Sequence, residues 1–100
     1  MKKLIFGNEA VVLGALDAGM KFYAGYPITP ASEIMHILSN EKNISFLQAE
    51  DEISSVNMCL GASLGGAKSM TATSGPGFSL MQEGIGYGHM ARIPMVIVDV

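Results

Sequence analysis

The sequence predicts an α/β fold, in which helices lie on both faces of a parallel β-sheet. Strand-like and helix-like hydrophobic patterns alternate along the 100 residues, and links of only a few residues join them, as in βαβ units. Glycine or proline stands at most of these links. The last run, "PMVIVDV", is apolar and rich in β-branched residues, which is typical of a parallel strand covered on both faces.

Capping residues predict the first two helices. Asn8 is a candidate N-cap and Gly19 a candidate end for a helix with spaced apolar residues, namely Val11, Leu13, Leu16 and Met20. A short strand over 21–26 follows. Thr29 and Pro30 then predict the start of the second helix, because threonine is a favourable N-cap and proline suits the first helical position. This helix should end within "SNEKN".

The remaining elements continue the alternation. A strand over 44–49 leads into a helix over about 50–64, which a glycine pair ends. A third strand over 68–74 leads through "GPG" into a helix that should last to about Arg92. The final strand covers 94–100. Right-handed crossovers would place the connecting helices over a parallel sheet.

We predict a single α/β domain over residues 1–100, without a linker or an internal repeat. Because the sequence stops on an apparent central strand, we interpret it as the N-terminal part of a longer chain. The segment "KKLIF" fits either a short edge strand or an irregular start. It also imitates a secretory signal peptide, but Asn8, Glu9 and Asp17 interrupt the apolar stretch and no cleavage-type site follows.

Composition narrows the class of protein. Charged residues make up only 15% of the chain, against about 25% in average soluble domains, so another chain or domain should cover part of its surface. The net charge of −3 argues against nucleic acid as a partner. No apolar run reaches the ~20 residues of a membrane helix. Cys59 is the single cysteine, which excludes an intrachain disulfide and favours a cytoplasmic protein.

Three strand-to-helix links could form a binding site, because ligands of open α/β sheets bind beyond the carboxyl ends of the strands. The link "GYPITP" offers a threonine hydroxyl and the amides of a new helix. The link "LQAEDEISS" brings three acids, Glu50, Asp51 and Glu52. Each link alone is also an ordinary turn or helix cap, but all three should lie at the same edge.

The third link, "TATSGPGFS", offers the hydroxyls of Thr71, Thr73 and Ser74. Its two glycines would let the backbone approach a ligand closely. Together the three links predict a binding site at this edge of the sheet.

Long motifs in this sequence resemble the α subunit of the 2-oxoacid:ferredoxin oxidoreductases, with the 2-oxoglutarate type most similar. They are "GNEA", "GYPITPASEI", "LQAEDEI", "GASLGGAKSMTATSGPGFSLMQEGIGY" and "PMVIVDV", in order over nearly the whole chain. The resemblance implies the pyrimidine-binding domain of the thiamine diphosphate fold. It also implies an enzyme that converts 2-oxoglutarate and coenzyme A to succinyl-CoA and passes electrons to ferredoxin.

The resemblance assigns roles to matching residues. Glu50 stands where the family places a catalytic glutamate against N1′ of the cofactor's aminopyrimidine. Thr29 matches a threonine that contacts the substrate. Two further groups would lie at the cofactor: Tyr26, Pro27 and Ile28 as a pocket wall, and Ser74, Gly75 and Pro76 near the pyrimidine or at a subunit contact. Glu52 is the second candidate for the catalytic role, and Asp51 reads as a solvated acid at a helix start.

The resemblance also implies partners. The glycine–aspartate–glycine motif that holds the diphosphate and Mg²⁺ in this family does not occur here, nor does a cysteine cluster for iron–sulfur. We therefore expect no metal ligands in this chain. A β subunit would carry the pyrophosphate-binding domain and an iron–sulfur subunit would pass electrons on, so this chain alone should be inactive.

Other readings stay open at this point. The same machinery could act on pyruvate or on branched-chain 2-oxoacids, and a non-catalytic flavodoxin-like binding module is an alternative of another class. We interpret His36 as a surface residue and expect Cys59 to pack in the interior. His89 and Arg92 suit the carboxyl end of a helix, although Arg92 could instead bind a substrate carboxylate.

Overall fold

A parallel β-sheet forms the centre of the molecule. The computed structural model describes residues 2–100, and its four strands are β1 (Phe22–Gly25), β2 (Ser45–Gln48), β3 (Ser69–Thr73) and β4 (Val96–Asp99). They lie in the order β2-β1-β3-β4, and every neighbouring pair is parallel. The parallel α/β sheet predicted from the alternating pattern is therefore confirmed.

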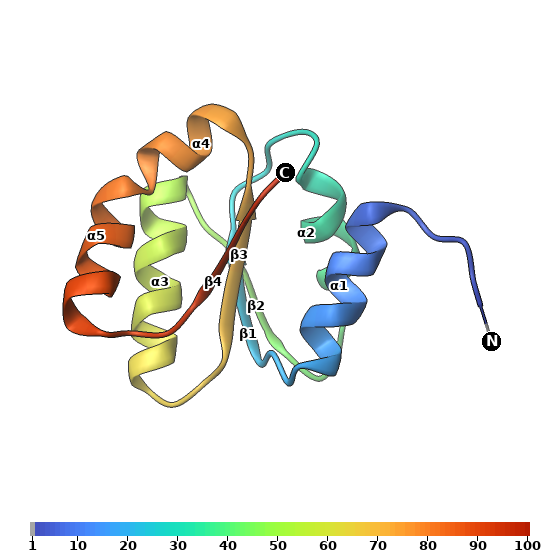
Figure 1. Cartoon of the computed structure of the whole chain (residues 1–100), viewed down its shortest axis with the longest axis horizontal. Coiled ribbons are helices and arrows are strands. Elements are labelled where there is room, and N and C mark those ends of the chain that lie inside the picture. The colour runs from blue at the N-terminus through green and yellow to red at the C-terminus, as the bar shows by residue number, and fades with distance from the viewer. Residues whose placement is uncertain (1) are drawn as a thin grey trace.

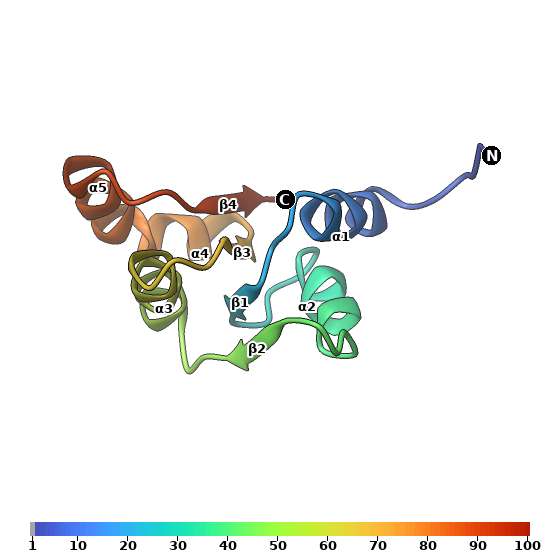
Figure 2. The same ribbon diagram turned by 90° about the horizontal axis from the view of Figure 1, so that it is seen from below.

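Helices cover both faces of the sheet (Figures 1 and 2). The helices α1 (Gly7–Asp17) and α2 (Ser32–Leu38) lie on one face. The other face carries α3 (Glu52–Leu64), with α4 (Gly75–Leu80) and α5 (Gln82–Ala91) beside it. This two-sided arrangement follows from right-handed connections on either side of β1.

The two faces of β3 differ in chemistry. Met70 and Ala72 point into an apolar cluster with Tyr23, Ile34 and Leu38, all of them buried. On this side the Tyr23 ring stacks on Phe46 of β2, with 5.7 Å between ring centroids. The alternate residues of β3, which are Ser69, Thr71 and Thr73, are equally buried and face α3.

Helix starts differ from the sequence predictions. The N-cap of α1 is Phe6 rather than Asn8, because the Asn8 amide donates instead to the Pro30 carbonyl (2.9 Å) and to Glu33 Oε1 (3.1 Å). Helix α2 starts at Ser32, with Ala31 as its N-cap, so the prediction that Thr29 caps this helix is wrong.

Other expected boundaries also change. The helix predicted from 75 to 92 is two helices, and the buried Met81 stands at the break. Residues 2–6 have no regular structure, so the edge-strand alternative for "KKLIF" is wrong. Strand β4 is not the buried strand that its apolar run predicted, because it pairs only with β3 among residues 2–100 and leaves Val96 55% exposed.

Candidate functional site

Three links meet at one edge of the sheet, at the top of Figure 1. Strands β1, β2 and β3 are parallel, so the loops that follow them leave from the same side. Backbone hydrogen bonds fix two of the strand ends: Ala49 N donates to the Gly25 carbonyl, and Val100 N donates to the Thr73 carbonyl. The three links predicted to form one site are thus at the same edge.

The β2–α3 link gives its three acids three different environments. Glu50 is exposed, and the Ser54 hydroxyl donates to its Oε1 at 3.2 Å. Asp51 is the N-cap of α3 and accepts a hydrogen bond from Ser54 N at 2.7 Å. Glu52 is the first residue of α3 and is only 6% exposed. Asp51 is therefore a half-buried capping residue rather than a solvated acid.

Local chemistry explains why the three carboxylates separate. Aspartate is a favoured N-cap because its short side chain reaches the amide two or three residues on. Glu50, on the strand side of that cap, stays exposed, and its contact with α3 is the hydrogen bond from the Ser54 hydroxyl. Glu52, on the helix side, turns inward with the first turn of α3. A ligand at this edge can thus reach the Glu50 carboxylate directly.

The β1–α2 link is open to solvent. Tyr26 is 40% exposed, and Pro27, Thr29 and Pro30 are also exposed. Ile28 is half-buried and packs against the apolar cluster, which anchors the loop. Because Thr29 does not cap α2, its hydroxyl remains available to a ligand.

The hydrogen bonds from Asn8 to this link were not foreseen from the sequence. The Asn8 side chain lies on α1, and it holds both the Pro30 carbonyl and the Glu33 carboxylate. These partners are more than 20 residues away along the chain, so no local pattern could have indicated the contact. Asn8 ties the link to the body of the domain.

In the β3–α4 link the predicted hydroxyls separate. Ser74 is half-buried at the N-cap position of α4, and its Oγ donates to the Val100 carbonyl at 2.9 Å. Gly75 and Pro76 are exposed. Thr71 and Thr73 are fully buried against α3, so the expectation that their hydroxyls face a ligand is wrong.

Glycine has a specific use in this link. Gly75 has φ +33°, and no heavy atom lies within 4 Å of the position where a Cβ would stand. The backbone there is open to a ligand. Gly77, by contrast, is buried, and a Cβ on it would collide with Thr73 Oγ1 and stand 2.7 Å from Glu52 Oε2.

The residues at this edge fit an aminopyrimidine. A ring nitrogen of that group can share a hydrogen bond with a carboxyl group, and Glu50 presents one that accepts from Ser54. A flat ring also needs apolar or aromatic walls and a close backbone. Tyr26 and Ile28 can supply the walls, and the exposed Gly75 the backbone. The carboxyl, the hydroxyl of Thr29 and these walls all come from links at one sheet edge.

Two buried groups in the interior have raised pKa values. Burial raises the pKa of Tyr23 to about 12, although a hydrogen bond with the Ala72 backbone acts in the opposite direction. Burial likewise raises the pKa of the Cys59 thiol to about 11, so the thiol stays protonated at neutral pH. The prediction that Cys59 packs in the interior is confirmed.

The remaining candidates lie elsewhere. His36 is exposed on α2, as predicted. Arg92 is the C-cap of α5, with φ 58°, and it precedes β4. It therefore lies at the amino edge of the sheet, away from the three links, and this position does not support the alternative that it binds the substrate. Among residues 2–100, no group of three His, Cys, Asp or Glu side chains could hold a metal ion, and none of the described helices could span a membrane.

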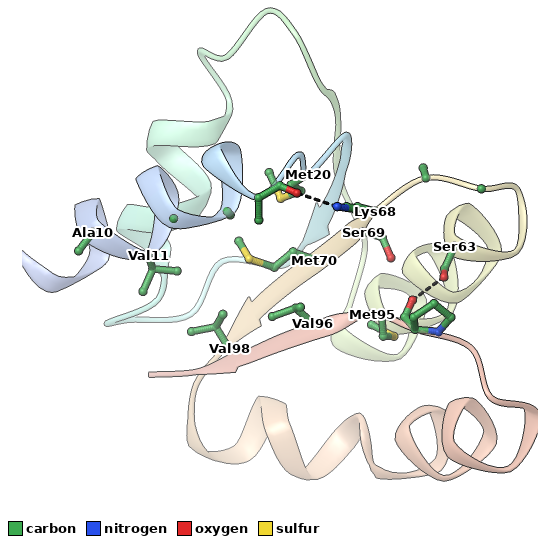
Figure 3. Close-up of a pocket in the computed structure, with 16 residues that line it drawn as sticks. Ala10, Val11, Met20, Ser63, Lys68, Ser69, Met70, Met95, Val96 and Val98 are labelled. Atoms are coloured by element: carbon green, nitrogen blue, oxygen red, sulfur yellow. Dashed lines mark hydrogen bonds between the residues drawn. The ribbon is translucent and has the colours of Figure 1, made fainter.

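An apolar groove of about 780 Å³ lies between α1 and the strands β3 and β4 (Figure 3). Its lining includes Val11, Met70, Val96 and Val98. None of the residues that line it belongs to the site predicted at the three links. The chemistry of the groove is almost wholly hydrophobic, so the polar edge is the better candidate for a reacting site.

The chain is similar to several known proteins. Residues 13–100 match the family described as pyruvate flavodoxin/ferredoxin oxidoreductase, thiamine diphosphate-binding. The chain is 55% identical to the 2-oxoglutarate synthase subunit KorA of Archaeoglobus fulgidus, over 98% of this chain and 29% of that subunit. It is 50% identical to the ketoisovalerate oxidoreductase subunit VorB of Methanothermobacter marburgensis, with the same coverage of 98% and 29%.

A solved structure is also similar. It is a 2-oxoglutarate:ferredoxin oxidoreductase from Magnetococcus marinus with 2-oxoglutarate, coenzyme A and succinyl-CoA bound, and it superposes with a TM-score of 0.91 at 47% identity. The likeness covers 96% of this chain and 17% of that one, so the chain spans less than a third of each of these relatives. The match over 88 of the 100 residues, from 13 to 100, shows that the chain belongs to the thiamine diphosphate-binding family of pyruvate flavodoxin/ferredoxin oxidoreductases.

Proposed function

We propose that this chain is the pyrimidine-binding domain of the α subunit of a 2-oxoglutarate:ferredoxin oxidoreductase. The observation that carries the proposal is the exposed Glu50 carboxylate at the carboxyl edge of the sheet, oriented by Ser54. Similarity to a 2-oxoglutarate synthase subunit at 55% identity supports the substrate. The domain would cover residues 1–100 of a longer subunit.

The reaction joins three changes. The bond between the carboxylate and the carbonyl carbon of 2-oxoglutarate breaks and releases carbon dioxide. The sulfur of coenzyme A bonds to that carbonyl carbon and gives succinyl-CoA, and the thiol proton is released. Two electrons leave, and two oxidised ferredoxins take up one each. When bound, thiamine diphosphate supplies the electron sink for the decarboxylation.

Glu50 would control a proton on the cofactor. Its carboxyl group would share a hydrogen bond with N1′ of the aminopyrimidine and thereby control the proton at that nitrogen. Ser54 restricts the orientation of the carboxylate by donating to Oε1. Tyr26, Pro27 and Ile28 would form one wall of the pocket and exclude water from it.

Thr29 would bind the substrate. Thr29 is exposed, and its hydroxyl does not cap α2. The hydroxyl can therefore donate a hydrogen bond to a carboxylate oxygen of the substrate. Ser74, Gly75 and Pro76 would lie near the pyrimidine or against the neighbouring subunit. The exposure of Gly75 and Pro76 supports either contact.

Partner subunits would complete the enzyme. We propose that a β subunit binds the diphosphate and Mg²⁺, and that an iron–sulfur subunit carries the electrons to ferredoxin in the cytoplasm. Large exposed apolar side chains, among them Ile53, Leu64, Tyr87 and Met90, support the presence of neighbouring chains. This domain alone would have no activity.

The test is a 2-oxoacid-dependent assay on the complete complex, with coenzyme A, thiamine diphosphate and Mg²⁺ and a low-potential electron acceptor. We expect the highest kcat/KM with 2-oxoglutarate, and Glu50→Gln should lower kcat by at least about 100-fold. Glu83→Gln, on the exposed start of α5, is the matched control and should leave kcat unchanged.

The outcomes separate the alternatives. A preference for pyruvate or for 3-methyl-2-oxobutanoate would change the substrate but keep the mechanism, and the similarity to the ketoisovalerate subunit makes the latter the second candidate. Activity that survives Glu50→Gln would contradict the role of Glu50. Turnover of no 2-oxoacid would favour a non-catalytic binding module.

A further inference from the structure

Glu52 is a buried carboxylate that the proposed mechanism does not use. It is 6% exposed and lies in the first turn of α3, where a negative charge is favoured by the helix dipole. It is also two residues from Glu50. Burying a carboxylate is unfavourable unless it gains a partner, so its surroundings need an explanation.

Two other elements contribute residues close to Glu52. Gly77 of α4 is buried, and a Cβ on it would stand 2.7 Å from Glu52 Oε2 and 3.1 Å from Glu52 Cγ. The same Cβ would collide with Thr73 Oγ1, at the end of β3. The Glu52 carboxylate and the Thr73 hydroxyl therefore both border the position that a Cβ of residue 77 would occupy. That position is vacant because residue 77 is glycine.

Thr73 is a donor in need of an acceptor. Its Oγ1 is fully buried and has no hydrogen-bond partner within the described part of the chain, and the same holds for Thr71 Oγ1. Buried hydroxyls without a partner are rare in folded proteins. Of the two threonines, Thr73 is the one whose hydroxyl borders the Gly77 position that the Glu52 carboxylate also borders.

We propose that Glu52 is a positioning residue, and that the Thr73 hydroxyl donates a hydrogen bond to its carboxylate in the assembled enzyme. The pair joins the start of α3 to the end of β3 under the first turn of α4. It would thereby fix the distance between Glu50 and the segment Ser74–Pro76. The inference rests on the proposed function, because these are the two segments assigned there to the cofactor.

The pair has a matched control within the same strand. Thr73→Val removes the donor at nearly constant volume, and Thr73→Ser retains it. Thr71→Val removes an equally buried and unpaired hydroxyl from the same face of β3, but Thr71 is not among the atoms around Gly77. Comparing these three variants separates loss of the pair from a general disturbance of β3.

The first measurement is hydrogen exchange of the complete complex without cofactor. Thr73→Val should raise exchange by roughly tenfold or more in residues 50–55 and 74–80 together, the scale of one hydrogen bond to a charged group. Thr73→Ser and Thr71→Val should leave both segments as in the unmodified complex. Unchanged exchange in Thr73→Val, or equal increases in Thr73→Val and Thr71→Val, would overturn the proposal.

The second measurement concerns the site itself. Calorimetric titration of the complex with thiamine diphosphate should show that Thr73→Val weakens binding by roughly tenfold or more, and that Thr73→Ser restores it. Glu52→Leu combined with Thr73→Val should weaken binding no further than the worse single variant, because the first removes the acceptor and the second the donor of the same contact. Additive losses, or no rescue by serine, would overturn the pair.

The two proposals can fail separately. If Glu50→Gln retains activity while Thr73→Val still loosens both segments, the proposed role of Glu50 fails and the contact between Glu52 and Thr73 stands. If Glu50→Gln is inactive but Thr73→Val exchanges like the unmodified complex, the proposed function stands and the positioning pair is wrong.

Discussion

The two faces of β3 have opposite chemistry, although the same five residues supply both. On one face Met70 and Ala72 join the apolar cluster beneath α1 and α2. On the other face Ser69, Thr71 and Thr73 meet α3. The first face resembles an ordinary core. The second is a buried polar layer that ends at the carboxyl edge, where the candidate site lies.

On the polar face, small side chains let α3 approach the backbone of β3 closely, and few large apolar side chains are buried there. The Ser69 hydroxyl donates to the Cys59 carbonyl at 2.8 Å, and the Cys59 thiol contacts the Met70 carbonyl at 3.4 Å. Small side chains such as Ser55 and Cys59 let α3 lie near the strand backbone. We infer that the apolar face contributes most of the stability and that the polar face sets the position of the site.

The largest expected effect comes from the apolar face. Ile34 is fully buried in the cluster, and Ile34→Ala should lower the free energy of unfolding by about 2–5 kcal/mol, because it leaves a cavity. His36→Ala on the same helix is the control, since His36 is exposed, and should change it by less than about 0.5 kcal/mol. Hydrogen exchange of α2 and β3 in the complete protein would measure both, and similar effects would contradict the comparison.

High pH should act on both faces through one buried group on each. The folded pKa of Tyr23 is raised to about 12 and that of Cys59 to about 11. Both groups stay protonated in the folded state where the unfolded chain has lost the proton, so stability is full below about pH 9 and falls as the pH rises to about 12.

Together the two groups lose on the order of 3–4 kcal/mol of stability by pH 11. The melting temperature of the complex, followed from pH 8 to pH 11, would show it. Tyr23→Phe and Cys59→Ala should each reduce the slope, and a melting temperature that rises over this interval would contradict the assignment of raised pKa values.

The smallest expected changes in stability distinguish bonded from unbonded hydroxyls on the polar face. Ser69→Ala removes a hydrogen bond to Cys59 and should destabilise β3 by about 1 kcal/mol. Thr71→Val removes a hydroxyl that has no partner among residues 2–100, so it should be neutral or slightly stabilising. Hydrogen exchange of β3 would compare them, and a larger loss for Thr71→Val would mean that Thr71 has a partner in the assembled protein.

The fold could be predicted because its signals are local. Alternating hydrophobic runs and glycine-marked links indicated the strands and helices, and the parallel sheet followed from their order. The boundaries that moved depend on distant contacts: Asn8 was expected to cap α1, but its amide is used 22 and 25 residues away by Pro30 and Glu33. The exposure of β4 depends likewise on what covers an edge, which no local pattern states.

The site could be predicted only in part. Resemblance of the link at 50–52 to a known family singled out Glu50, and the structure exposes it. It could not reveal that Glu52 is buried, or that Thr71 and Thr73 point inward, because strand alternation fixes which residues share a face but not which face meets solvent. The use of Gly77 also depends on side chains from two other elements.

The central claim is that two acids in one link have different tasks, Glu50 at the cofactor and Glu52 in positioning. The most direct test measures kcat for 2-oxoglutarate in the complete complex carrying Glu50→Gln or Glu52→Gln, each saturated with thiamine diphosphate. The account predicts that Glu50→Gln loses at least about 100-fold in kcat even at saturating cofactor, whereas Glu52→Gln retains most of kcat and binds the cofactor more weakly. A kcat abolished by Glu52→Gln and preserved by Glu50→Gln would contradict it.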